Sequence, residues 1–249
     1  MFLKKLLNFI MELLLKLTKN RDKIDLSDYP VRTIDPGTLT LDQELAMRGI
    51  LAAAALGHEN ALIPELTQDQ FDEVVTHIGL HFGNADLCKN IALKRGSIAK
   101  VNLDIYKEAI VHKAELDRRV EEALSTLYEG TIENKLMQVS KYIANRVKYK
   151  AGSNNPLDLL DEGGMCCAYS MLFYKMATRL GAEAYICYGY ASNGIYSGAH
   201  AWNMVKLGEK YYFYDITFYD SGRNKKYIHS DTTWERSYRL NDQSGMRKA

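Results

Sequence analysis

The sequence predicts an α+β protein in which helices come first and an antiparallel sheet comes last. Between residues 38 and 147, apolar side chains recur mostly at three- or four-residue spacing, as on one face of a helix. From Ala182 onward the chain changes to runs rich in Tyr, Ile, Val and Phe that short turns separate. Helices and strands that are segregated along the chain, rather than alternating, are typical of the α+β class.

The composition is that of a folded globular protein. Apolar residues make up 47% and charged residues 25% of the 249 positions, and only 4 prolines interrupt regular structure. A chain of this length holds one large domain or a core with a smaller partner domain. Because 32 basic residues are balanced by 31 acidic ones, the net charge is +1, and no broad basic surface indicates nucleic acid as a partner.

Residues 1–19 predict an amphipathic helix. Lys4 and Lys5 precede apolar residues, as in a secretory signal, but Glu12 and Lys16 interrupt the apolar run, and its unbroken part is too short to span a bilayer. We expect this helix to lie on a membrane surface or to pack against the rest of the chain or a partner protein. A degenerate signal anchor is the third interpretation, so cytoplasmic, membrane-associated and exported locations all stay open.

Residues 20–37 contain Pro30 and Pro36 and are interpreted as a linker. Four helices with apolar residues at helical spacing are expected after it, at residues 38–56, 67–82, 106–128 and 133–147. Two strands are expected between the second and third helices, at residues 88–94 and 98–106. The second strand is predicted because Val101, Leu103 and Ile105 alternate with polar residues.

The last third of the chain predicts an antiparallel meander. Three strands are expected, at residues 184–191, 198–207 and 210–218. A turn around Asn193-Gly194 joins the first two, and Gly208-Glu209 joins the last two.

The four cysteines do not form an evident disulfide framework. They are Cys88, Cys166, Cys167 and Cys187, and an adjacent pair rarely forms a disulfide because the geometry is strained. His77 and His81 stand four positions apart, yet no nearby residues complete a metal-ligand set. The pattern therefore predicts no metal site.

Cys166 stands where a helix is expected to begin. The stretch Asp161–Gly164 gives way to an apolar helical segment that ends at Leu180-Gly181. Free backbone N–H groups and the positive end of a helix dipole stabilise a thiolate and can hold an oxyanion. A cysteine at a helix start is by itself weak evidence, because buried cysteine often acts as a small apolar side chain.

His200 and Asp215 are expected on the last two strands of the meander. If Gly208-Glu209 is a two-residue turn, Leu207 pairs with Lys210, and Asp215 lies diagonally from His200 on one face of the sheet. A helix that carries Cys166 across this sheet would align nucleophile, base and orienting carboxylate. The alternatives are that Asp215 only caps a turn at a strand end and that His200 is a half-buried sheet residue.

Three short motifs together resemble the signature of the transglutaminase-like superfamily, which reads G-x-C-x-x-Y-[AS], H-[AS]-W-[NV] and D-x-T-[WF]. They are Gly164-Met165-Cys166-Cys167-Ala168-Tyr169-Ser170, His200-Ala201-Trp202-Asn203 and Asp215-Ile216-Thr217-Phe218. The resemblance covers roughly residues 105–235 and is greatest to bacterial members. Phe218 stands where Trp is frequent in the family, and Cys167 stands at a variable position, so we interpret it as a packing or bystander thiol.

The resemblance implies a papain-like fold in which the nucleophile helix packs on an antiparallel sheet. It also implies that Cys166 is the nucleophile, His200 the base and Asp215 the residue that orients His200. The predicted organisation is an amphipathic helix at residues 1–22, a small α+β region at 23–104 and a transglutaminase-like catalytic core at 105–249.

The expected function is cysteine-dependent acyl transfer on amide bonds of a protein or peptide through a thioester. With water as the second substrate the protein would be a peptidase or amidase, and with an amine it would be a transglutaminase. The alternative is a non-catalytic binding or scaffold protein that keeps the fold. No metal or organic cofactor is implied, and calcium would need oxygen-ligand clusters that the sequence does not present.

Overall fold

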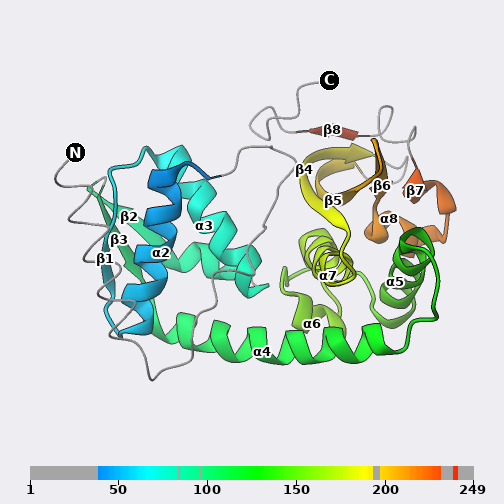
Figure 1. The fold of residues 1–249 in the computed structure, drawn as a ribbon, viewed down its shortest axis with the longest axis horizontal. Helices are drawn as coiled ribbons and strands as arrows, with labels where there is room; N and C mark the ends of the chain where they lie inside the picture. The colour runs from blue at the N-terminus through cyan, green and yellow to red at the C-terminus, as the bar shows by residue number, and fades with distance from the viewer. Residues whose placement is uncertain (1–38, 84, 96, 193–196, 231–237, 241–249) are drawn as a thin grey trace. The chain divides into compact units, whose positions relative to one another are not determined.

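The computed structural model describes residues 39–83, 85–95, 97–192, 197–230 and 238–240 (Figure 1). The amphipathic helix predicted for residues 1–19 and the linker predicted for residues 20–37 lie outside the described residues. The chain divides into two compact units. Unit 1 contains the described residues of Leu39–Phe82 and Asp86–Ile110, and unit 2 contains Gly83, Ala85 and the described residues from Val111 onward. The domain boundaries predicted at residues 22 and 104 stay predictions.

Unit 1 combines helices with a small antiparallel sheet of strand order β1-β3-β2. Its elements are α2 (Leu41–Ala55), β1 (Asn60–Leu62), α3 (Gln68–Phe82), the 3-10 helix η2 (Ala85–Asn90), β2 (Ile91–Lys94), β3 (Ile98–Val101) and the first part of α4 (Leu103–Ser125). Buried side chains of α2, α3 and the sheet, including Ile50, Phe71 and Val101, form one core. The sequence did not predict β1, which is only three residues long.

The helix predicted over residues 38–56 is confirmed as α2. Thr40 caps it, because its hydroxyl accepts a hydrogen bond from the Gln43 N–H while the Gln43 side chain accepts one from the Thr40 N–H. This reciprocal arrangement satisfies two backbone donors that a helix start otherwise leaves unpaired. The helix predicted over residues 67–82 is likewise confirmed, as α3.

The predicted strands at residues 88–94 and 98–106 are too long. The first begins only at Ile91, since the preceding residues form η2, and the second ends at Val101. The Asn102 side chain accepts hydrogen bonds from the N–H groups of Asp104 and Ile105, which starts α4 immediately after the strand. The alternation of Leu103 and Ile105 with polar residues therefore belongs to the first turn of a helix.

Unit 2 contains a five-stranded antiparallel sheet of strand order β7-β6-β5-β4-β8. Its strands are β4 (Glu183–Ser192), β5 (Ser197–Leu207), β6 (Lys210–Tyr214), β7 (Ile228–Ser230) and β8 (Tyr238–Leu240). Its helices are the last part of α4, α5 (Ile132–Arg146), α6 (Pro156–Asp161), α7 (Cys166–Arg179), α8 (Ile216–Gly222) and the 3-10 helix η3 (Lys225–Tyr227). The sequence did not predict α6, α8, β7 or β8.

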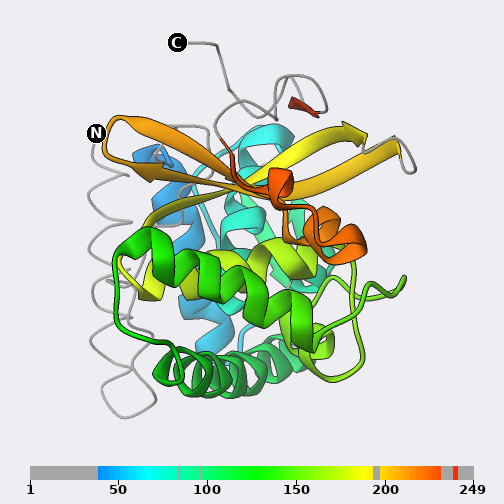
Figure 2. The ribbon, with the colours of Figure 1, turned by 90° about the vertical axis from the view of Figure 1, so that its right-hand side faces the viewer.

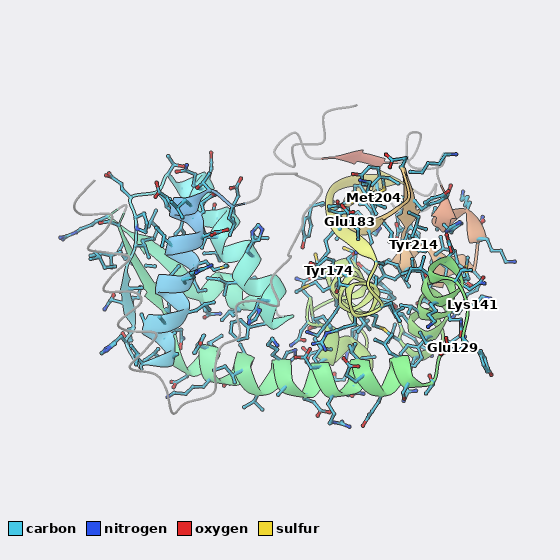
Figure 3. All side chains as sticks on the ribbon, in the orientation of Figure 1. Glu129, Lys141, Tyr174, Glu183, Met204 and Tyr214 are labelled. Carbon is cyan, nitrogen blue, oxygen red and sulfur yellow. The ribbon has the colours of Figure 1, made fainter. Side chains whose placement is uncertain are left out.

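Helix α7 is the central helix of unit 2. One side of it packs on β4 and β5, and it also contacts α5, α6 and α8 (Figures 1 and 2). Phe173 of α7 stacks on Tyr214 of β6 with ring centroids 4.9 Å apart. Tyr214 is labelled among the side chains of unit 2 in Figure 3. The predicted α+β class, with the helix that begins at Cys166 packed on an antiparallel sheet, is confirmed.

The register of the meander agrees with the expected turn. Leu207 pairs with Lys210, and pairing continues to Asn203 opposite Tyr214. The third strand is shorter than predicted, because the chain leaves the sheet after Tyr214 and enters α8 at Ile216.

A cluster of charges joins α7 to α4 on the side away from the sheet. Asp117 of α4 accepts from Lys113 at 2.9 Å, from Lys175 at 2.6 Å and from Arg179 at 3.1 Å. The Lys175 side chain is only 14% exposed, so its ammonium group depends on this carboxylate for compensation.

Within the described residues, none of the helices has both the length and the apolar character that crossing a bilayer requires.

Replacing Asp117 with Ala is expected to lower the free energy of unfolding by about 2 to 3 kcal/mol, because Lys175 is left buried without its carboxylate. Glu122→Ala on the same helix is the matched control. Its partner Arg118 is 55% exposed, so we expect little change in the free energy of unfolding. Urea titration of both variants measures the difference, and equal losses would contradict a special role for the Asp117 cluster.

Candidate active site

Just before Cys166, residues 163–165 run against residues 148–153 and are hydrogen bonded to them, and we call this backbone contact the crossing. The Lys150 N–H donates to the Gly164 carbonyl at 3.1 Å, and the Gly164 N–H donates to the Lys148 carbonyl at 3.2 Å. The Met165 N–H then donates to the Ser153 carbonyl at 2.8 Å. The residues directly before Cys166 are thus tied to residues 148–153, which follow α5, and the start of α7 has a fixed position.

Gly163 is required for this crossing. Its backbone has a φ of 103°, and a Cβ at this position would lie 2.5 Å from the Lys148 carbonyl oxygen. No L side chain fits there without a shift of the backbone. Gly163 therefore fixes the path of the chain before Cys166, a role that the sequence did not reveal.

Cys166 is the first residue of α7. In an α-helix the first N–H groups have no partner four residues earlier, so they point outward from the helix end. The thiol of Cys166 is partly buried and lies at this end. Donors and dipole at this position favour a thiolate and a developing oxyanion.

His200 and Asp215 form a buried pair next to this helix start. His200 Nε2 donates to Asp215 Oδ2 at 2.7 Å, and the two side chains are 2% and 0% exposed. His200 lies on β5, and Asp215 follows directly after the last residue of β6. The structure thus brings together the histidine and the carboxylate that the motifs indicated, just past the point where Asn203 pairs with Tyr214.

Asp215 also starts α8. Its second oxygen, Oδ1, accepts a hydrogen bond from the Phe218 N–H at 2.9 Å, which is the geometry of an N-cap. One carboxylate oxygen of Asp215 thus caps α8, while the other accepts from His200.

The Cys166 thiol is hydrogen bonded to His200, which brings the three candidate residues into one group. The pKa of Cys166 is lowered to about 4, first by a hydrogen bond from the Cys167 thiol, then by the hydrogen bond and charge of His200 and by the Ala201 N–H; burial opposes these effects. A pKa in this range means that the sulfur is ionised at neutral pH.

His200 is the cationic partner of this thiolate. Burial by itself would lower the pKa of His200, but the charge and hydrogen bond of Asp215, followed by those of Cys166, raise it to about 9. Since Nε2 is bonded to Asp215, Nδ1 is the ring nitrogen that remains for the sulfur. The shifts of both groups favour a thiolate–imidazolium pair, with the buried carboxylate of Asp215 behind the imidazole.

Aromatic rings fix the orientation of the imidazole. The Phe218 ring stacks on His200 with centroids 4.3 Å apart and an interplanar angle of 17°. Trp202, on the same strand as His200, is also nearly parallel to it at 6.2 Å. Phe218, which departs from the Trp frequent in the family, thus still provides an aromatic face against His200.

Asn203 is a residue to which sequence reasoning gave no role. Its side chain is buried, and Nδ2 donates to the Ser170 carbonyl of α7 at 3.0 Å and to the Tyr185 carbonyl of β4 at 3.1 Å. These bonds join the helix that carries the thiol to the sheet that carries the imidazole. Its position in the motif that begins at His200 is the sequence signal that could have indicated this role.

The other cysteines have different environments. Cys187 is buried, and desolvation raises the pKa of its thiol well above the ordinary value. Cys88, in unit 1, donates to the Val75 carbonyl at 3.2 Å. Cys167 is partly buried, and its thiol is hydrogen bonded to Cys166. The interpretation of Cys167 as a packing or bystander thiol did not predict this bond.

No group of three or more His, Cys, Asp or Glu side chains is placed to hold a metal ion in the part of the chain that the structure describes. His77 uses Nδ1 to donate to the Glu73 carbonyl of its own helix at 2.8 Å.

The arrangement of thiol, imidazole and carboxylate is the one on which cysteine-nucleophile sites are built. Residues 116–216, which include Cys166, His200 and Asp215, match the family model of the transglutaminase-like superfamily.

Two solved structures are similar to the chain. One is a candidate cysteine protease from Cytophaga hutchinsonii, with 22% identity and a TM-score of 0.36 over 42% of this chain and 37% of that one. The other is described as a TGase, with 17% identity and a TM-score of 0.39 over 71% of this chain and 54% of that one. The chain thus spans less than two thirds of either structure. No curated protein matches the sequence.

Gly163→Ala is expected to destabilise the protein by about 3 kcal/mol, because the new methyl group meets the Lys148 carbonyl and the backbone keeps a positive φ. Gly181→Ala is the matched control: its φ is 83°, but nothing lies within 4 Å of the added Cβ, so only backbone strain of about 1 kcal/mol is expected. Chemical denaturation measures the free energy of unfolding of both variants. Equal losses would mean that the backbone at Gly163 can shift to accommodate a side chain.

Proposed function

We propose that this protein is a cysteine-dependent acyl-transfer enzyme that acts on amide bonds, with Cys166 as nucleophile, His200 as acid and base, and Asp215 as the residue that orients His200. The observation that carries the proposal is the buried His200–Asp215 hydrogen bond of 2.7 Å, with the His200 ring hydrogen bonded in turn to the thiol at the start of α7. The family match is consistent with this chemistry.

In the first step the Cys166 thiolate attacks the carbonyl carbon of the amide. The negative charge moves to the carbonyl oxygen, where N–H groups at the start of α7 are available as donors. The C–N bond then breaks, and the imidazolium of His200 gives its Nδ1 proton to the leaving amine. The products of this step are a thioester on Cys166, a free amine and a neutral His200.

In the second step a nucleophile attacks the thioester while His200 accepts its proton. Water yields a carboxylic acid, so the enzyme would be a peptidase or amidase, whereas a primary amine yields a new amide, so it would be a transglutaminase. Either reaction restores the thiolate and the imidazolium. Asp215 stabilises the imidazolium at both stages and keeps Nε2 engaged, so that Nδ1 faces the sulfur.

We also propose a protein or peptide as the substrate. Tyr149 forms a parallel bridge with Gly164, two positions before Cys166, and its side chain is 53% exposed. An exposed aromatic side chain on the segment that pairs with Gly164 supports contact with an extended chain, because tyrosine offers a large apolar face together with a hydroxyl group.

Limiting iodoacetamide near neutral pH is expected to alkylate Cys166 about tenfold or more ahead of Cys88, Cys167 and Cys187, because Cys166 is the ionised thiol. His200→Ala should remove most of this advantage, since the imidazolium no longer stabilises the thiolate. Peptide mapping by mass spectrometry measures all four thiols in one sample. If Cys166 reacts no faster than the others, or if Cys167 is the fast thiol, the proposal fails and a binding or scaffold role takes its place.

Asp215→Asn is expected to raise the pH midpoint of Cys166 alkylation. The charge of Asp215 raises the pKa of His200, and the resulting imidazolium lowers the pKa of Cys166, so loss of the charge moves the thiol toward its ordinary value. Asn caps a helix as well as Asp does, so α8 should keep its start. The pH dependence of the alkylation rate measures the midpoint.

Asp161→Asn makes the same change in net charge at an exposed side chain, which pairs with Arg119, and serves as the control. We expect it to leave the midpoint at its original acidic value. An unchanged midpoint in Asp215→Asn would instead rule out electrostatic support of His200 by Asp215.

A further inference from the structure

We propose that Tyr169, Asp220 and Arg223 are positioning residues that hold α7 against α8 and so keep the Cys166 sulfur beside the His200–Asp215 pair. This inference rests on the proposed function. None of the three side chains is proposed to contact the substrate. Each of them acts by fixing the position of another residue.

The first contact joins the two helices directly. The Tyr169 hydroxyl donates to Asp220 Oδ2 at 2.9 Å, and Tyr169 is only 1% exposed. Tyr169 lies on α7 nearly one turn after Cys166, and Asp220 lies on α8. The bond therefore connects the start of the thiol-bearing helix to the helix that Asp215 caps.

The second contact extends this connection to a third helix. The other oxygen of Asp220, Oδ1, lies 3.2 Å from Arg223 Nη2, and the same Arg223 nitrogen also donates to the Ala144 carbonyl near the end of α5. Arg223 occupies the left-handed region at the end of α8, with a φ of 53°, and its guanidinium lies over the Tyr219 ring. One carboxylate thus links α7, α8 and, through Arg223, α5.

This connection acts on the site because α8 carries two groups that fix the imidazole. Asp215 caps α8 and accepts from His200, and Phe218 of α8 stacks on the His200 ring. The thiol, in contrast, belongs to α7. A displacement of α7 relative to α8 would change the distance between sulfur and imidazole directly, and candidate sites of this kind tolerate only about 0.5 Å of such error.

The environment of Asp220 fits this role. Burial raises the pKa of its carboxyl, whereas the Tyr169 hydrogen bond and the Arg223 charge act in the opposite direction. A partly buried carboxylate with a donor on each oxygen is held in one orientation, as a link between helices requires.

The test is the pH dependence of Cys166 alkylation in Tyr169→Phe. We expect the acidic midpoint to rise by about one pH unit, which is about a tenfold slower reaction below the midpoint, because the thiolate loses part of its contact with His200. Tyr214→Phe is the matched control. It removes another buried hydroxyl of unit 2, one that is hydrogen bonded to His229 at 2.9 Å, and should leave the midpoint unchanged.

A second pair of variants tests whether Tyr169 and Asp220 act together. Asp220→Ala should raise the midpoint at least as much as Tyr169→Phe, because it also removes the Arg223 contact, and the double variant should raise it no further than Asp220→Ala does. Asp220→Asn still offers an oxygen to the Tyr169 hydroxyl, so it should raise the pH midpoint of Cys166 alkylation less than Asp220→Ala does. The comparison of these two variants tests the link if Tyr169→Phe does not fold.

The outcomes separate the two proposals. If the unaltered protein has no acidic midpoint for Cys166, the proposed function fails and this inference fails with it. If the unaltered protein has that midpoint and Tyr169→Phe keeps it while losing thermal stability, the function stands and Tyr169 only stabilises the fold.

Discussion

The carboxylate of Asp215 is the interaction on which the candidate site depends. It is fully buried, and each of its oxygens has a separate partner, the Phe218 N–H for one and His200 Nε2 for the other. The first bond ends β6 and starts α8, and α8 brings Phe218 back over the imidazole. The second bond fixes which ring nitrogen faces the thiol. A single side chain therefore determines both the local path of the chain and the electrostatics of the site.

Much of the region around the site could be predicted because its signals are local. The turn at Gly208-Glu209 sets the pairing of Leu207 with Lys210, and this pairing determines where Asp215 lies relative to His200. The glycines before Cys166 and the apolar run after it mark a helix start, and α7 begins there. Turn length, side-chain alternation and helix start signals act over a few residues, so a single sequence contains them.

Other parts could not be predicted, because helix caps or contacts between distant residues override the local side-chain pattern there. Residues 216–218 continue a strand-like pattern, yet the Asp215 cap turns them into α8. Leu103 and Ile105 alternate as in a strand, yet Asn102 starts a helix there. The bond between Tyr169 and Asp220 spans two helices, one of which the sequence did not reveal. Cap strength and long-range pairing outweigh local propensity at each of these places.

The crossing before Cys166 also has a topological consequence. Bonds between Ser153 and Met165, and between Lys150 and Gly164, close the base of an excursion of the chain that contains α6. The thiol therefore follows a loop whose two ends are hydrogen bonded to each other, and α6, which packs on α7, lies inside that loop.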